Sequence, residues 1–161
     1  MVKKSFSIKD LTRNAIYIAL YVTLCYAFAP ISFGVVQVRV AEALCILPIF
    51  DTFSIVSVTI GCFLSNLIIS ANILDAVFGG LATFVGLLLI LYIKKNNFFL
   101  KMLPTILSNA IIIPFVLIYA YGINEPIWFS AITVAIGEII SVYGIGYLLY
   151  IFLNKHKELF K

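Results

Sequence analysis

The strongest constraint on this chain is a series of apolar stretches, each long enough to cross a lipid bilayer. One crossing takes about 20 consecutive apolar residues in a helix. Of the 161 residues, 63% are hydrophobic and only 11% are charged, whereas roughly a quarter of the residues in a soluble domain are charged. The segments of about ten alternating residues that mark outer-membrane barrels are absent from the sequence. The sequence therefore predicts an all-α integral membrane protein.

Six membrane-spanning helices, in a single membrane domain over residues 1–161, are predicted from the apolar runs and the residues that break them. Pro30 ends the first run and Gly34 lies in an irregular connection, so the second helix is short and the least regular. Pro114 predicts that the fifth helix is bent or interrupted. The expected helices are 11–29, 39–50, 52–71, 76–93, 102–119 and 127–153.

Basic residues gather at three places along the chain. They lie before the first helix, between the fourth and fifth, and after the sixth, at Lys3, Lys4, Lys9, Arg13, Lys94, Lys95, Lys101, Lys155, Lys157 and Lys161. With six spans, all three groups fall on one side of the membrane. Because cytoplasmic loops are enriched in Lys and Arg, we expect both termini in the cytoplasm and a multi-pass protein of the bacterial plasma membrane.

The run from Gln37 to Leu44 places an arginine and a carboxylate in this apolar protein. A charged group at membrane depth costs about 2.5–3.5 kcal/mol even on the mildest scale, so it is rare without a partner or a task. Arg39 and Glu42 stand three residues apart, on one helix face, and could neutralise each other. Gln37 adds a third polar group, and three convergent polar groups suit a small hydrogen-bonding ligand. Both interpretations stay open.

Glu138 is the sharpest single candidate. It lies about eleven residues into the last helix, roughly 15 Å deep at 1.5 Å per residue, and no basic residue of its own helix can pair with it. Such a carboxylate needs Arg39, a hydrogen-bond donor, a ligand or a proton, so a ligand or gating role competes with a structural one. Asp75 precedes the fourth helix, where it could contact a ligand or serve as the N-cap.

Three further residues could contact a ligand, although each has a simpler explanation. Asn66 and Asn109 fall within predicted helices, where an amide commonly bridges to a neighbouring helix. Trp128 could stack on a planar ligand, although the membrane interface is the ordinary location of tryptophan.

Small side chains recur every fourth residue along the first helix, at Ala15, Ala19 and Thr23. This spacing lets another helix approach closely. The stripe could pack inside the bundle, or it could be a docking face for a separate membrane subunit.

Nothing in the sequence indicates an enzyme. It has no phosphate-binding loop, no pair of metal-binding histidines and no Ser/His/Asp set, and its one histidine, His156, lies in the C-terminal tail. Cys25, Cys45 and Cys62 lie in separate apolar segments and fit small buried hydrophobes better than a disulfide or a metal site. The net charge of +4 comes from residues at membrane edges. We therefore expect no catalytic residue, cofactor, metal or nucleic-acid partner.

Several motifs resemble the QueT transporter family, and the resemblance covers nearly the whole chain. The motifs are Ser32-Phe33-Gly34, residues 37–44 (QVRVAEAL) with Leu47-Pro48, Ile60-Gly61-Cys62, Ser65-Asn66, residues 74–83 (LDAVFGGLAT), residues 109–112 (NAII) and Gly137-Glu138.

This resemblance implies an S component, the substrate-binding membrane subunit of an energy-coupling factor (ECF) transporter, with six helices and a binding site on the extracellular side. It implies uptake of a queuosine precursor, preQ1 (7-aminomethyl-7-deazaguanine) above all. The implied partners are a membrane coupling protein and two cytoplasmic ATPases. Ala15 and Ala19 match the small-residue motif with which S components dock on the coupling protein.

The residues fit such a ligand. The predicted substrate-binding residues are Gln37, Arg39, Glu42, Asn66, Asp75, Asn109, Trp128 and Glu138. Either Glu42 or Glu138 could accept the two parallel N–H donors of the guanine edge, with Asp75 on the cationic amine, and exchanged roles fit equally well. The alternatives are an S component for another vitamin, such as thiamine or riboflavin, an intramembrane enzyme using Glu42 or Glu138, and a structural membrane subunit without a transport role.

Overall fold

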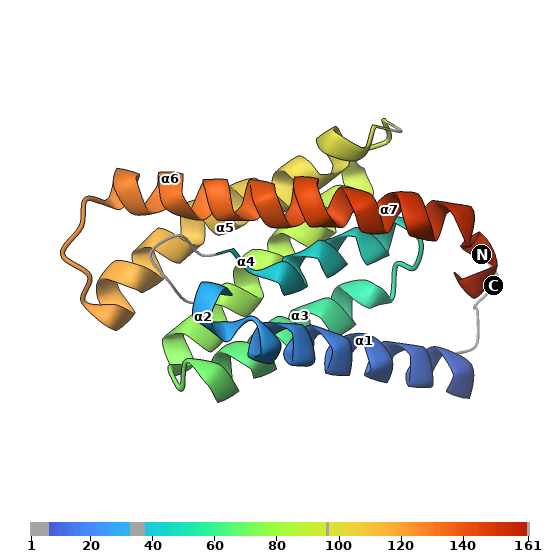
Figure 1. The fold of residues 1–161 in the computed structure, drawn as a ribbon, viewed down its shortest axis with the longest axis horizontal. Helices are drawn as coiled ribbons and strands as arrows, with labels where there is room; N and C mark the ends of the chain where they lie inside the picture. Colours follow the sequence, from blue (N-terminus) through green and yellow to red (C-terminus); the bar gives the residue numbers. More distant parts are fainter. Residues whose placement is uncertain (1–6, 33–37, 96, 161) are drawn as a thin grey trace.

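A computed structural model describes residues 7–32, 38–95 and 97–160 of the chain. Within these residues every regular element is a helix, and the helices run roughly along one long axis (Figure 1). Gly34 and Gln37 lie outside the described residues. The protein is an α-helical membrane protein, as its apolar runs predict.

The first helix, α1 (Ile8–Ala27), begins three residues before its expected start because a capping box fixes its N-terminus. The Ser7 hydroxyl accepts a hydrogen bond from the Lys9 N–H at 3.3 Å, and the Asp10 carboxylate accepts one from the Ser7 N–H at 3.2 Å. These two bonds satisfy N–H groups that have no partner inside the helix. The helix ends just before Pro30, which lies in the single turn α2 (Ala29–Ser32).

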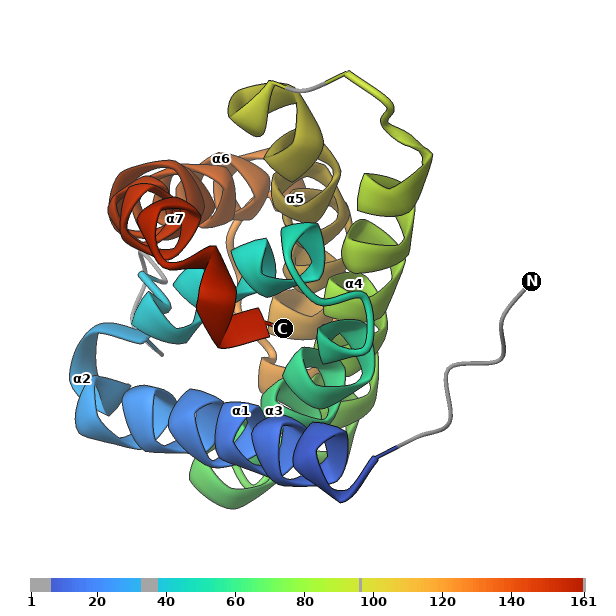
Figure 2. The same ribbon diagram turned by 90° about the vertical axis from the view of Figure 1, so that its right-hand side faces the viewer.

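The second predicted helix is present as η1 (Val40–Ile49), but it is a 3₁₀-helix. Figure 2 shows it in the middle of the bundle, surrounded by the longer helices. Every residue from Ala41 to Pro48 is buried. At about 2.0 Å per residue, a ten-residue 3₁₀-helix extends roughly 20 Å, so this element is the core around which the others pack.

Two helices joined by a short turn follow, α3 (Ser54–Ile69) and α4 (Ile73–Tyr92). The N-cap of α4 is Asn72, whose side chain accepts from the Leu74 N–H at 3.0 Å. Asp75 lies inside the first turn of α4 and is buried, so the N-cap interpretation of Asp75 is wrong.

The longest uninterrupted α-helix is α5 (Phe98–Tyr121), and it continues through both Pro104 and Pro114. Of the two predicted alternatives at Pro114, a bend or an interruption, the interruption is therefore wrong. Proline is tolerated in membrane helices because neighbouring helices and local adjustments satisfy the freed backbone groups. The helix ends at Gly122, whose left-handed φ of 65° and hydrogen bond to Ile118 C=O form a C-cap.

The last helical rod has three parts, α6 (Ile127–Glu138), the π-helical segment η2 (Ile139–Ile145) and α7 (Gly146–Lys155). A short 3₁₀ turn, η3 (Lys157–Phe160), follows, and the Phe160 ring stacks on Phe50 with centroids 5.1 Å apart. The π-helical segment begins directly after Glu138. Such local widening is frequent at functional sites.

Within the part of the chain that the structure describes, three helices are long and apolar enough to cross a membrane: Ile73–Tyr92 with 20 residues, Phe98–Tyr121 with 24 and Ile127–Lys155 with 29. The apolar helices η1 and α3 are shorter. Figure 1 places the start of α1, the end of α7 and the α4–α5 connection at the same end of the long axis.

The close approach of α4 and α5 predicts a measurable effect on stability. A Cβ atom on Gly86 would lie 2.6 Å from the Thr105 Cα, whereas one on Gly144 would have no atom within 4 Å. We therefore expect Gly86→Ala to lower the free energy of unfolding by about 1–3 kcal/mol. Gly144→Ala should leave it unchanged or raise it by up to about 1 kcal/mol. Thermal unfolding in detergent measures both, and equal effects of the two substitutions would contradict the close helix contact.

Candidate functional site

A buried arginine lies where three helices meet. Arg39 is the N-cap residue of η1 and is only 5% exposed. Its Nη1 donates to Asn66 Oδ1 on α3 at 3.3 Å, and its Nη2 lies 3.8 Å from Asp75 Oδ1 on α4. The acidic partner that the structure gives Arg39 is thus a residue far along the chain. A buried ion pair of this kind ties η1, α3 and α4 together.

Asp75 and Asn66 have further partners. The Tyr121 hydroxyl, at the end of α5, donates to Asp75 Oδ2 at 2.8 Å. The Asn66 Nδ2 donates to the backbone carbonyl of Asp75 at 3.1 Å. Asn66 therefore accepts from Arg39 with one end of its amide and holds the first turn of α4 with the other.

Glu42 forms a second centre one turn along η1, and it is 1% exposed. The Tyr21 hydroxyl on α1 donates to its Oε1 at 2.5 Å. The Cys45 thiol donates to its Oε2 at 2.9 Å. Both oxygens of this carboxylate thus accept hydrogen bonds from the protein, which makes its burial tolerable.

Glu138 and Asn109 form the third part of the site. They are 4% and 3% exposed, and their side chains are neighbours across α6 and α5, with Glu42 and Arg39 as the charged groups nearest to Glu138. Yet Glu138 Oε2 and Asn109 Nδ2 each lack a hydrogen bond of normal geometry. An unpaired buried polar atom costs about 1–3 kcal/mol. The Asn109 amide and the Glu138 carboxylate therefore interact only through a long or poorly aligned side-chain hydrogen bond, and both groups could turn to a ligand that offers a donor and an acceptor.

We call these residues the polar cluster: Tyr21, Arg39, Glu42, Cys45, Asn66, Asp75, Asn109, Tyr121 and Glu138. It contains one guanidinium group and three carboxyl groups. This excess of acidic groups suits a ligand with a cationic group, and the poorly paired Asn109 amide and Glu138 carboxylate suit one with both donors and acceptors.

The structure thus brings together six of the predicted substrate-binding residues, namely Arg39, Glu42, Asn66, Asp75, Asn109 and Glu138. Gln37 lies outside the described residues. Trp128 is 62% exposed near the start of α6, and its described ring contact is edge-on to Phe129, so it lies apart from the cluster contacts. Among the described residues, no group of three His, Cys, Asp or Glu side chains is arranged to hold a metal ion.

Sequence reasoning missed Tyr21, Cys45 and the bond from Tyr121. Tyr21 is fully buried in α1, and a tyrosine hydroxyl buried in a membrane helix usually needs a partner. A tyrosine in the middle of an apolar helix therefore predicts a buried hydrogen bond, although spacing along the chain does not identify Glu42 as its partner.

The stripe on α1 is on the outer surface. Ala15, Ala19 and Thr23 are all exposed, while Tyr21 and Cys25 on the same helix are buried against η1 and α3. The stripe is therefore not covered by the described part of the bundle.

Comparison with known proteins identifies the family. A family model described as "QueT transporter" matches residues 11–155. The chain belongs to the QueT transporter family. A relative named "Queuosine precursor transporter QueT", from Lactococcus lactis subsp. cremoris (strain MG1363), is 39% identical over 95 residues. That alignment covers 55% of this chain and 56% of the relative, so the chain spans only about half the length of the curated relative that it matches. No solved structure matches the chain.

The matched region of this QueT family member contains the whole polar cluster, because the cluster runs from Tyr21 to Glu138 and the family match from residue 11 to 155. The family model is described as a transporter, so the polar cluster lies within the region that this transporter family shares.

The Arg39–Asp75 ion pair predicts a large effect of one substitution. Asp75→Asn keeps the size of the side chain but removes the negative charge beside a buried guanidinium, so we expect the free energy of unfolding to fall by about 3–5 kcal/mol. Glu125→Gln, in the exposed α5–α6 connection, is the matched control and should change it by less than about 0.5 kcal/mol. Unfolding in detergent by heat or denaturant measures both. Equal stabilities would show that Asp75 does not balance Arg39.

Proposed function

We propose that this protein is the substrate-binding S component of an ECF-type transporter that imports a queuosine precursor, specifically preQ1. The observation that carries the proposal is the buried Glu138 carboxylate, whose interaction with the Asn109 amide falls short of normal hydrogen-bond geometry. Membership of the QueT family and the printed name of the Lactococcus relative support the substrate class.

The chemistry of preQ1 matches these groups. Its guanine-like edge presents two parallel N–H donors, which a carboxylate accepts in a bidentate manner. Glu138 is the best candidate for this contact, because Glu42 and Asp75 already accept hydrogen bonds from the protein. The Asn109 amide would donate to the ring carbonyl. Glu42 and Asp75 supply the negative charge that the aminomethyl cation requires.

We also propose six spans with both termini in the cytoplasm. The start of α1, the end of α7 and the connection with Lys94 and Lys95 lie at one end of the molecule (Figure 1). Asp75 and Tyr121 lie at the opposite ends of α4 and α5 from those lysines. With the basic end inside, the Arg39–Asp75 side of the cluster lies toward the extracellular surface, where the substrate is captured.

Delivery to the cytoplasm by an S component requires partner subunits. The exposed stripe of Ala15, Ala19 and Thr23 is a candidate contact for a membrane coupling protein, because small side chains let helices pack closely. Two cytoplasmic ATPases bound to that coupling protein would supply the energy.

The test is calorimetric titration of the purified protein in nanodiscs with preQ1, with guanine, thiamine and riboflavin as competitors. Tight binding of preQ1 that the vitamins do not displace is the expected result. Binding of thiamine or riboflavin in place of preQ1 would be consistent with an S component but would contradict preQ1 as its substrate. Absence of binding by folded protein would favour a structural subunit.

Substitution of Glu138 tests the ligand contact. Glu138→Gln removes the charge and one acceptor with little change in shape, so we expect preQ1 binding to weaken by about 1.5–3 kcal/mol, or roughly 12- to 150-fold. Glu125→Gln, an equal change of charge at an exposed site, should leave the Kd unchanged. If Glu138→Gln bound preQ1 as tightly as the wild type, another group would have to read the guanine edge.

Large side chains introduced into the α1 stripe test whether it is a docking face. We expect Ala15→Trp combined with Ala19→Trp to abolish uptake by cells while the purified protein still binds preQ1, because both side chains are exposed and remote from the cluster contacts. Leu20→Trp, on another exposed position of α1, is the control and should preserve both. Loss of binding together with uptake would mean that the stripe packs inside the folded protein.

A further inference from the structure

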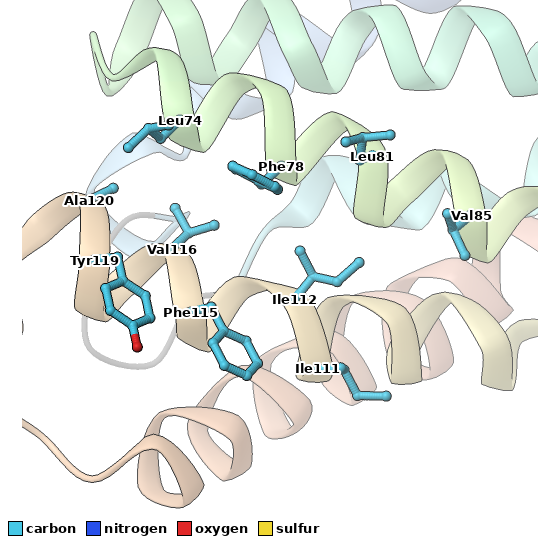
Figure 3. A pocket seen from close by; sticks show the side chains of 10 residues that line it. All are labelled: Leu74, Phe78, Leu81, Val85, Ile111, Ile112, Phe115, Val116, Tyr119 and Ala120. Atoms are coloured by element: carbon cyan, nitrogen blue, oxygen red, sulfur yellow. The ribbon is translucent and has the colours of Figure 1, made fainter.

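An apolar groove follows the outer surface where α4 and α5 pack together. We call the part of the groove near Leu74 and Tyr119 its outer segment and the part near Lys95 its inner segment. The outer segment has a volume of about 590 Å³, and Figure 3 shows it between side chains of the two helices. The inner segment has a volume of about 550 Å³. The two segments share Val85, Ile111 and Ile112 as lining residues, so they form one continuous groove.

The close contact at Gly86 explains the floor of the groove. There the α4 backbone approaches Thr105 and Ser108 of α5 so closely that no side chain fits. On either side of this contact, large apolar side chains project outward. Leu81 and Leu89 of α4 form one wall and Leu107 and Ile111 of α5 the other, and each is between 40% and 65% exposed.

The two ends of the groove differ in charge. The outer end, at Leu74, Tyr119 and Ala120, has no charged lining residue. The inner end is lined by Lys95, and the adjacent Lys94 is also exposed. No acidic side chain lines either segment. The groove is therefore apolar along its length and positively charged at its inner end.

The length of the inner segment matches one leaflet of a bilayer. From Ile93 to Val85 the helix α4 advances about 12 Å at 1.5 Å per residue, close to half of a hydrocarbon core of roughly 30 Å. A chain lying in this segment would end near the place where the outer segment begins.

We infer that the inner segment of this groove is a binding site for an anionic phospholipid, with one acyl chain between α4 and α5 and the phosphate at Lys94 and Lys95. Apolar lining, leaflet length and basic mouth together match an acyl chain attached to a negatively charged headgroup. The inference requires only that the protein lies in a membrane, and it is independent of the substrate proposed above.

Fluorescence quenching by brominated lipids tests this site directly. The chain has a single tryptophan, Trp128, so Leu107→Trp in a Trp128→Phe background places the one reporter in the groove wall. The control reporter, Leu148→Trp in the same background, lies on the exposed surface of α7, seven residues before Lys155 and outside the groove residues. This control position has a basic residue nearby but does not lie in the groove.

In bilayers that mix phosphatidylcholine with brominated phosphatidylglycerol, or the reverse, we expect the groove reporter to prefer phosphatidylglycerol by roughly five-fold or more, the effect of about one lysine at a membrane surface. The control reporter should prefer it by less than two-fold.

Equal preference at the two positions would mean ordinary contact with surrounding lipid and would overturn the inference. Absence of quenching by both lipids at Leu107→Trp would also overturn it, because the groove would then be covered by protein, such as a second copy of the chain.

The headgroup contact needs its own comparison. Lys94→Gln with Lys95→Gln should remove the preference of the groove reporter for phosphatidylglycerol. Lys155→Gln with Lys157→Gln removes the same charge from the end of α7 and should leave the preference in place. A preference that survived the first pair, or that both pairs abolished equally, would overturn the assignment of the phosphate to Lys94 and Lys95.

Discussion

A guanidinium group in an apolar interior must be surrounded by acceptors and counter-charge, and in this protein that requirement falls on Arg39. Its side chain stands at the start of the central helix η1 and binds Asn66 of α3 and Asp75 of α4. Asp75 in turn accepts a hydrogen bond from Tyr121 of α5. One buried charge therefore fixes how four helices meet, and it places Glu42, one turn further along η1, in contact with Tyr21 of α1.

This arrangement separates polar groups that serve the fold from those left for a ligand. Glu42 and Asp75 are each held by two partners in the protein. Glu138 and Asn109 interact with each other, but without a hydrogen bond of normal geometry. Because a poorly paired buried polar atom destabilises the protein, the retention of Glu138 in a cluster with two other carboxyl groups is best explained by a ligand that pairs with it.

The sequence predicts much of this site, since a polar residue in an apolar helix has few reasons to be there, and six of the predicted residues lie in the cluster. The choice of partners could not be predicted. Arg39 and Glu42 are close in the chain, yet the ion pair joins Arg39 to Asp75, because helix packing and not spacing decides which groups meet. The 3₁₀ form of η1 and the uninterrupted course of α5 through Pro114 also depend on tertiary packing, which overrides local propensity.

The two proposed contact surfaces lie apart from each other. Because α1 and α5 lie on opposite sides of the bundle (Figure 2), a partner on the α1 stripe and a lipid in the α4–α5 groove would not compete.

The most direct test of this account is a structure of the protein in nanodiscs with preQ1 bound. The account predicts ligand density among η1, α5 and α6, with the guanine edge on the Glu138 carboxylate and the ring carbonyl on the Asn109 amide. Density elsewhere, with Glu138 and Asn109 in contact only with each other, would contradict the central claim that these two buried groups bind the substrate.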